Sequence, residues 1–250
     1  MADLMDTADV SGRFALQGHD TAHPLIRPVD AASLILVDRS TRAPRLLFGR
    51  RNPSLRFMPG KFVFPGGRVD AGDRHVPVYG MLDAESERRL SARVSRPSAA
   101  RARALALAAI RETFEEAGLI IGTREAGAPE RLPAGWDGFV DAGVFPNLEA
   151  LTFVARAITP PRLARRFDTR FFMADAGDVA HRIEGVVGPE AEIVETAWLT
   201  IAEARKAELP EITLAIVDEV EARLKGGNRP WQPVPFYFTR RGRVYREALS

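Results

Sequence analysis

Residues 111–119 read R-E-T-F-E-E-A-G-L, a run that combines three glutamates and an arginine with a closing glycine. At about 100° per residue in a helix, Glu112, Glu115 and Glu116 fall on one side. The residues on the other side are apolar: Ala106, Leu107, Ile110, Phe114 and Ala117. Because an apolar stripe fixes a helix to a core, it would hold the three carboxylates together despite their mutual repulsion. Hard divalent cations prefer such oxygen clusters, although a glutamate-rich face can also be simply solvated.

The neighbouring sequence favours the metal site over a solvated face. Upstream, residues 64–70 read F-P-G-G-R-V-D, a glycine turn after a strand-like run. Ser98 is suited to be the N-cap of the helix, and Gly118 stands where its C-cap belongs. Together these residues resemble the signature of Nudix hydrolases, G-x5-E-x7-R-E-U-x-E-E-x-G-U, in which U is aliphatic. Residues 111–119 match its second half, with Thr113 at one aliphatic position, and Gly67 supplies its first glycine.

The match departs from the signature in its middle. Asp73 stands where the family usually has glutamate, and 37 residues separate it from Arg111 in place of seven. Such an insertion, at about 74–97, is tolerable because a longer surface loop adds only slowly to the closure entropy. The sequence leaves open whether Asp73 joins the site. It also leaves open whether the insertion is a lid or the contact of a homodimer.

The resemblance implies hydrolysis of a diphosphate with Mg²⁺ or Mn²⁺ as cofactor. Carried over residue by residue, the metal ligands would be Glu112, Glu115, Glu116 and the carbonyl oxygen of Gly67. Arg111 precedes Glu115 by one helical turn, where it can orient that carboxylate. The catalytic residues would then be Glu112, Glu116 and Arg111. The general base stays open among four glutamates: Glu112, Glu190, Glu192 and Glu195.

The substrate is indicated by residues 46–67, which are similar to the coenzyme A diphosphatase signature L-L-T-x-R-[SA]-x3-R-x3-G-x3-F-P-G-G. The sequence departs from it at Phe48 and Arg51 and by one extra residue before Arg56. Residues 57–67 and 166–172 are most like the acyl-CoA diphosphatase branch. That likeness implies cleavage of CoA or acyl-CoA to 3′,5′-ADP and (acyl-)4′-phosphopantetheine. It places five residues at the substrate: Arg50, Arg56, Gly60, Phe64 and Gly66. The two arginines suit the extra 3′-phosphate of CoA.

Two other functions remain open. The same helix serves Nudix enzymes that act on ADP-ribose, NADH, dinucleoside polyphosphates or oxidised deoxynucleotides. Those sites use stacking aromatic side chains, which Trp136, Phe145 and Phe172 could supply. A non-catalytic Nudix module that only binds its ligand is the other alternative. The complete carboxylate set argues against it.

Bulk composition is that of an ordinary globular protein, with 46% hydrophobic and 27% charged residues. No run of eighteen apolar residues occurs and no secretory signal is visible, so we expect neither a membrane partner nor export. A net charge of +2 argues against a nucleic-acid-coating protein. The absence of cysteine excludes disulfides and suits a cytoplasmic location. The expected partner is therefore a small-molecule diphosphate.

The order of expected elements predicts one domain, at 28–250, after an N-terminal arm at 1–27 that is loosely held. Strands are expected at 31–37, 45–49, 62–64, 151–158, 169–173 and 193–199. Helices are expected at 81–90, after Ser98, at 201–207 and at 212–224, and a hairpin at 235–245. Strands on both sides of a helix without regular alternation predict an α/β (α+β) protein with a mixed sheet. The resemblance implies the Nudix α-β-α sandwich, with an inserted helical segment.

Overall fold

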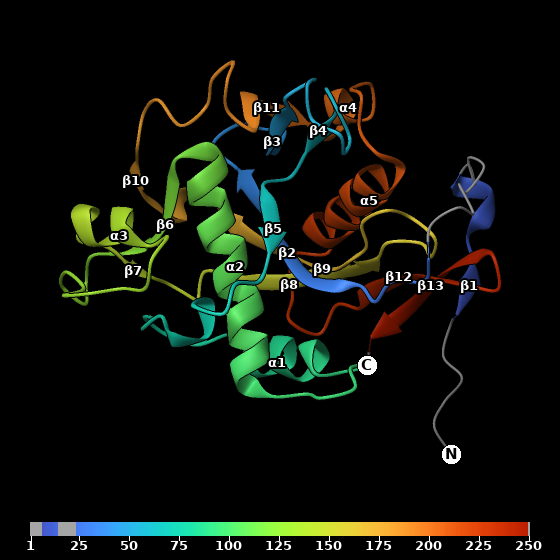
Figure 1. The fold of residues 1–250 in the computed structure, drawn as a ribbon, viewed down its shortest axis with the longest axis horizontal. Helices are drawn as coiled ribbons and strands as arrows, with labels where there is room; N and C mark the ends of the chain where they lie inside the picture. The colour runs from blue at the N-terminus through green and yellow to red at the C-terminus, as the bar shows by residue number, and fades with distance from the viewer. Residues whose placement is uncertain (1–6, 15–23, 250) are drawn as a thin grey trace.

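A mixed sheet forms the centre of the computed structural model, which describes residues 7–14 and 24–249. Its main path runs β1 (Ala8–Asp9), β13 (Arg243–Leu249), β12 (Val234–Arg240), β8 (Thr152–Ile158), β9 (Phe167–Asp175), β2 (Val29–Asp38), β3 (Arg45–Arg51) and β11 (Ile193–Thr200) (Figure 1). The short strands β4 (Phe62–Val63) and β5 (Gly66–Arg68) pair with β3 and β2. The β2–β9 and β12–β8 pairs are parallel and the other pairs are antiparallel, so the predicted mixed sheet is confirmed.

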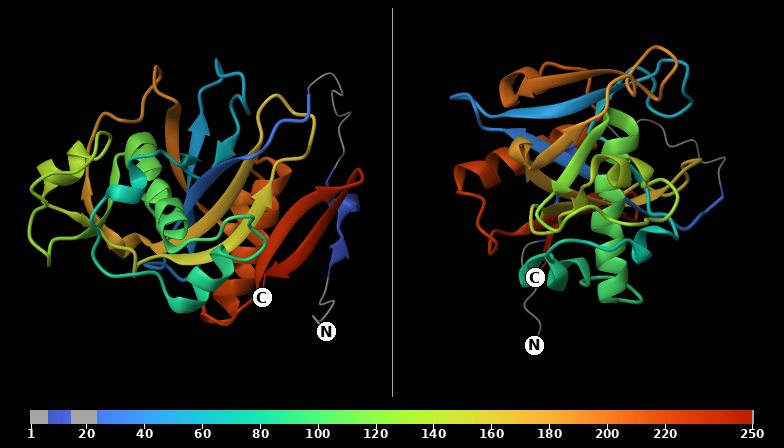
Figure 2. Two further views of the ribbon diagram at one scale, coloured as in Figure 1. Left: turned by 60° about the horizontal axis from the view of Figure 1, so that its bottom comes forward. Right: turned by 90° about the vertical axis from the view of Figure 1, so that its left-hand side faces the viewer.

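Helices cover both faces of this sheet (Figures 1 and 2). The long helix α2 (Ala99–Ala117) lies on one face, and α5 (Glu211–Lys225) lies on the other. The central strand β2 serves both layers, because its side chains alternate between the faces. Leu34 and Leu36 pack in the cluster around α2, whereas Ile35 and Val37 pack in the cluster around α5. This two-sided burial explains why the strand reads as an uninterrupted apolar run.

The remaining elements lie at the edges of the sandwich. A second sheet joins β10 (Val179–Arg182), β6 (Leu119–Thr123) and β7 (Phe145–Pro146), next to α3 (Asp137–Ala142). The helix α4 (Ile201–Ala204) precedes α5, and short 3₁₀ turns occur at Ser11–Arg13, Asp73–His75 and Ala176–Asp178. In the expected hairpin, Arg241 and Gly242 connect β12 to β13 with φ of 50° and 76°. Two positive φ angles are typical of the tight I′ turn.

Both predicted caps of α2 are confirmed. Ser98 is the N-cap, and its hydroxyl accepts a hydrogen bond from the N–H of Arg101 at 3.2 Å. Gly118 is the C-cap, with φ of 68°. A Cβ at this position would lie 2.3 Å from the carbonyl oxygen of Ile183, so the close approach requires glycine as much as the left-handed backbone does.

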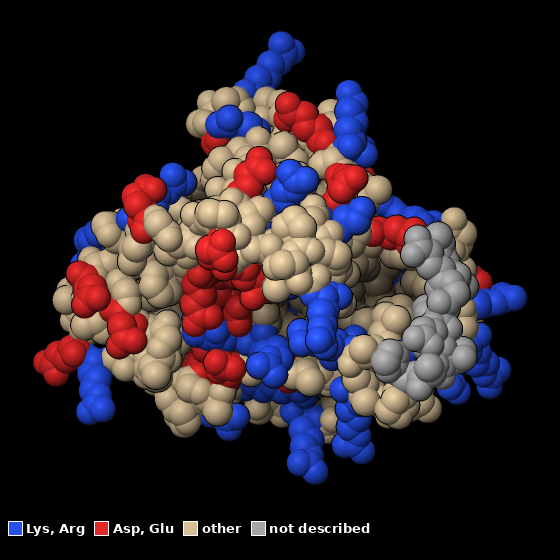
Figure 3. Space-filling view, turned by 45° about the horizontal axis from the view of Figure 1, so that its top comes forward, with Lys and Arg blue, Asp and Glu red and all other residues tan. Residues whose placement is uncertain are grey.

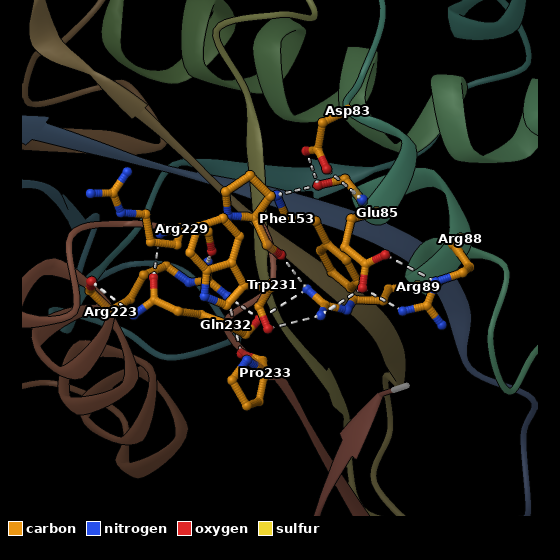
Figure 4. Close-up of polar contacts among 12 residues, drawn as sticks. Asp83, Glu85, Arg88, Arg89, Phe153, Arg223, Arg229, Trp231, Gln232 and Pro233 are labelled. Atoms are coloured by element: carbon orange, nitrogen blue, oxygen red, sulfur yellow. Dashed lines mark hydrogen bonds and ion pairs between the residues drawn. The ribbon is translucent and has the colours of Figure 1, made fainter.

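The insertion forms a helix that is fastened to the domain. The helix α1 (Ala84–Leu90) begins after Asp83, whose side chain accepts from the N–H of Ser86, so it starts later than the predicted 81–90. Arg89 donates to the carbonyl oxygens of Pro230 at 2.8 Å and Gln232 at 2.9 Å (Figure 4). The insertion is therefore a brace between α2 and the loop before β12.

The predicted arm is only partly loose. Ala8 and Asp9 form β1, which pairs with Tyr245 and Arg246 of β13, so this part of the arm extends the sheet. The expectation of a loosely held arm is wrong for these residues, because backbone hydrogen bonds to the edge strand fix them. The arm also includes residues 1–6 and 15–23, which lie outside the described residues. Within the described ranges, the helices are all too short or too polar to cross a bilayer.

Candidate active site

The C-terminal half of α2 faces the glycine turn that contains β5. The turn is positioned because Gly66 and Gly67 pair with Ser33 and Ala32 of the buried strand β2. When this end of α2 is turned toward the viewer, acidic side chains gather in one patch near the middle of the face, with basic side chains beside it (Figure 3). Helix and turn together hold the predicted carboxylates at one place.

Arg111 is the centre of the charged contacts. Its guanidinium is 4% exposed and donates hydrogen bonds from Nη1 to Glu112 Oε1 and Glu115 Oε2, both at 2.9 Å. The predicted contact between Arg111 and Glu115 is thus present. Nη2 donates to the carbonyl oxygen of Arg68 at 2.8 Å. The arginine therefore ties the helix to the end of β5 while it orients two carboxylates.

Asp73 completes this arrangement from the other side of the insertion. Its side chain is 1% exposed and accepts from Arg111 Nε at 2.9 Å and Nη2 at 3.2 Å. It also accepts from the backbone N–H of Asp70 at 2.8 Å. The question left open by the sequence is answered in part. Asp73 lies in the site as the partner of Arg111, and its shorter side chain reaches because the Asp73–His75 turn carries it under the helix.

Glu116 is the most buried of the three helix carboxylates, at 8% exposure. Its Oε2 accepts a hydrogen bond from the N–H of Gly66 at 2.9 Å. Burial raises the pKa of Glu116 to about 8, because leaving water disfavours the charged form more than one backbone donor favours it. The charges of Glu192 and Arg51 act on this pKa in opposite directions, so both lie near the carboxylate.

Glu112 occupies the space that a side chain at position 67 would need. A Cβ on Gly67 would lie 2.4 Å from the carboxylate carbon of Glu112. Burial raises the pKa of Glu112 to about 7, and it also raises the pKa of Glu115. The turn therefore requires glycine to let the carboxylate approach the backbone.

The donor chemistry of this cluster fits a hard divalent cation. Burial disfavours the charge of these three carboxylates. Their oxygens are ligands of the type that Mg²⁺ and Mn²⁺ prefer. Across residues 7–14 and 24–249, no three acidic or histidine side chains stand close enough to form a finished metal site. Arg111 holds Glu112 and Glu115, and Gly66 holds Glu116, so ion binding would require these side chains to turn.

The predicted substrate residues are divided between the two faces of the sheet. Arg56 is exposed and Gly60 adopts φ of 70° in the loop between β3 and β4. Phe64 is 4% exposed and stacks on Phe48 at 4.7 Å between ring centroids, so its side chain packs in the core beneath α5. Arg50 lies over the ring of Phe62 and pairs with Glu195 at 3.6 Å. Its strand places it on the α5 side, away from Glu116.

Arg51, which departs from the coenzyme A diphosphatase signature, lies near Glu116. Its Nη1 pairs with Glu192 Oε1 at 2.9 Å. Strand alternation could have identified it, because Arg51 shares a face with Leu47, which packs toward α2. Two of the three aromatics considered for base stacking, Trp136 and Phe172, are fully buried in the core. Their rings are therefore not available to a ligand.

No family model matches the sequence. The chain is 30% identical over 154 residues to a Caenorhabditis elegans protein named "Putative nudix hydrolase 7", an alignment that covers 57% of this chain and 43% of the relative. The chain thus spans less than half the length of that relative.

Among solved structures, the NUDIX hydrolase from Alicyclobacillus acidocaldarius is 25% identical, with a TM-score of 0.56, and the match covers 78% of this chain and 91% of that chain. The NUDIX domain of Shewanella oneidensis NrtR, complexed with ADP ribose, matches with a TM-score of 0.44 and 12% identity over 80% of this chain and 90% of that chain. That second likeness is too distant to bear on substrate.

Proposed function

We propose that this chain is a divalent-metal-dependent diphosphatase of the Nudix hydrolase superfamily. The relatives that it matches are Nudix hydrolases, and its mixed sheet and helices form a Nudix-like α+β fold. One observation carries the proposal. Glu112, Glu115 and Glu116 meet the Gly66–Gly67 turn, held there by Arg111 and by the Gly66 N–H. A surface of carboxylates repels a diphosphate unless cations stand between them, so this arrangement suits a site that binds substrate through metal ions.

Each residue of the cluster then has a distinct task. Glu112, Glu115 and Glu116 would hold Mg²⁺ or Mn²⁺, with the Gly67 carbonyl oxygen as a further ligand. The bound metal supplies charge neutralisation and a more acidic water. Arg111, fixed by the buried Asp73, sets the direction of Glu112 and Glu115. In the reaction, the oxygen of a water molecule bonds to phosphorus and one bridging P–O bond breaks.

CoA or acyl-CoA is the substrate that we propose, with 3′,5′-ADP and (acyl-)4′-phosphopantetheine as products. The support is the run at 46–67, with Arg56 and Gly60 in the loop between β3 and β4 and Gly66 hydrogen-bonded to Glu116. The burial of Trp136 and Phe172 removes two of the aromatics that a base-stacking nucleotide site would use. Of the candidate bases, Glu112 belongs to the cluster itself and Glu192 lies beside it.

A turnover panel tests the proposal. The protein is incubated with Mg²⁺ or Mn²⁺ and, in separate reactions, CoA, acyl-CoAs, ADP-ribose, NADH, a dinucleoside polyphosphate and an oxidised deoxynucleotide, and products are read by mass spectrometry. We expect 3′,5′-ADP from CoA or acyl-CoA at the highest kcat/KM. Metal-dependent cleavage of one of the other diphosphates, without cleavage of CoA or acyl-CoA, would make that compound the substrate and refute the CoA assignment. If the protein binds these ligands but cleaves none of them, the chain is a non-catalytic module that only binds its ligand.

A further inference from the structure

The strand β3 presents two adjacent arginines to opposite faces of the sheet. Leu46 and Phe48 pack in the cluster beneath α5, and Arg50 continues that row. Leu47 packs in the cluster around α2, and Arg51 continues the row on that side. Because side chains alternate along a strand, Arg51 is directed toward the end of α2 that carries Glu116.

Arg51 is held firmly in place. Its side chain is 13% exposed, and its Nε donates to the carbonyl oxygen of Phe57 at 3.0 Å. The guanidinium carbon also lies 5.9 Å from the centre of the Phe57 ring. Backbone pairing adds to this, since the N–H of Asn52 donates to the carbonyl oxygen of Glu192 at 2.8 Å. The cation is therefore fixed by β3, by its loop and by the segment that leads into β11.

The partner of this cation is held much less firmly. Glu192 Oε1 lies 2.9 Å from Arg51 Nη1, but the glutamate side chain is 52% exposed. Half-exposed ion pairs contribute little net stability, because water solvates the separated charges well. The carboxylate of Glu192 can therefore leave the guanidinium at small cost, whereas Arg51 cannot follow it.

We propose that Arg51 binds a phosphate oxygen of the substrate, and that Glu192 occupies this position as a carboxylate substitute when no substrate is bound. The inference rests on the proposed diphosphatase function. Arg111 is committed to Asp73, Glu112, Glu115 and the Arg68 carbonyl oxygen, so it has no donors to give to a ligand of this site. A guanidinium with a replaceable anion on its outer nitrogen matches a phosphate group, which it can grip with two parallel hydrogen bonds.

The arrangement also separates two roles for Glu192. As a substitute anion, Glu192 competes with substrate, and its neutralisation should tighten binding. As a general base, it would be required for the chemical step, and its neutralisation should lower kcat. The two roles therefore predict opposite changes from the same substitution.

The experiment compares neighbours on the same strands. Affinity for α,β-methylene-ADP, a diphosphate that cannot be cleaved at its bridge, is measured by calorimetry with Mg²⁺ for Arg51→Ala, Arg51→Lys and Arg50→Ala. KM and kcat with CoA are measured for the same variants and for Glu192→Gln and Glu195→Gln. We expect Arg51→Ala to weaken binding and raise KM about tenfold or more, and Arg51→Lys to restore part of the loss.

The paired glutamates complete the test. We expect Glu192→Gln to lower KM severalfold and to leave kcat within about threefold. An equally large fall in KM for Glu195→Gln, whose partner is Arg50, would overturn the proposal. Equal effects of Arg51→Ala and Arg50→Ala would overturn the proposal, as would a loss of about a hundredfold in kcat for Glu192→Gln, which would make it the base. If Arg51→Ala does not fold, Arg51→Lys and Glu192→Gln decide alone.

The outcomes also distinguish this inference from the proposed function. If the mimic binds in a way that requires Arg51 but no diphosphate is cleaved, the proposed diphosphatase function is refuted and the phosphate-binding role of Arg51 is supported. Cleavage of CoA that is insensitive to Arg51 would refute the anion site and leave the enzyme.

Discussion

The backbone N–H of Gly66 lies 2.9 Å from Oε2 of Glu116, a hydrogen bond between residues 50 positions apart. It joins the glycine turn on β5 to the last turn of α2. The whole insertion lies between them in sequence, yet α1 packs aside against the loop at 229–233. The bond shows how the two halves of an interrupted signature can still form one site.

Glu116→Gln should lower kcat by orders of magnitude while the protein stays folded. The substitution keeps the size of the side chain and its acceptor for Gly66, but it removes the charge that a metal ion requires. The measurement is kcat with the best substrate of the panel, alongside circular dichroism and thermal unfolding without metal. Glu208→Gln, at a side chain that is 74% exposed, is the matched control. Retention of more than about a tenth of wild-type activity would remove Glu116 from the site.

Stability of the metal-free protein should fall as pH rises through the neutral range. Folding raises the pKa of Glu112 to about 7 and that of Glu116 to about 8, from 4.5. Between these values the folded protein binds more protons than the unfolded chain, so the free energy of unfolding decreases with pH. Urea unfolding in EDTA should show a loss on the order of 5 kcal/mol between about pH 5 and pH 8.

Two controls belong to this pH dependence. Glu116→Gln should flatten the slope, because one of the two titrating groups is gone. Added Mg²⁺ should raise the melting temperature more at the alkaline end, where the carboxylates are deprotonated ligands. A stability that rises with pH through this window would contradict the burial of these groups.

Gly67→Ala should lose activity without unfolding the domain. The new methyl group would lie 2.4 Å from the carboxylate carbon of Glu112, so the glutamate has to move out of the cluster. Gly188→Ala is the matched control, because a methyl group there meets nothing within 4 Å. We expect a loss of about a hundredfold in kcat/KM for the first variant and none for the second. Equal activity in both would show that Glu112 is not needed where it lies.

Arg89→Ala should loosen the insertion and lower stability. The change removes the donor to the carbonyl oxygen of Pro230 and one of the two donors to that of Gln232, which Arg223 Nη2 also reaches at 3.2 Å. We expect a fall in melting temperature of about 5–10 °C. Arg88→Ala is the control, because Arg88 pairs with the same Glu85 but is 52% exposed. If the two variants have the same melting temperature, the contacts of Arg89 do not make the insertion a brace.

Much of the fold follows from local sequence. The helix after Ser98, its end at Gly118 and the buried strand at 31–37 are specified by caps and by apolar patterning within a few residues. The N-terminal pairing of Ala8 and Asp9 with β13 was not foreseen, since their partner lies more than 230 residues away. Edge pairing of a two-residue strand leaves no pattern in the sequence.

The candidate site divides in the same way. Helical periodicity is a local property, so the order of residues in α2 is enough to specify which carboxylates share a helix face. Two contacts needed the folded chain: Asp73 reaches Arg111 across the insertion, and Arg51, on the side of β3 that faces α2, pairs with Glu192. Those facts depend on which way a loop folds back and which face of β3 meets α2. Both are set by packing between segments far apart in the chain, which no local pattern records.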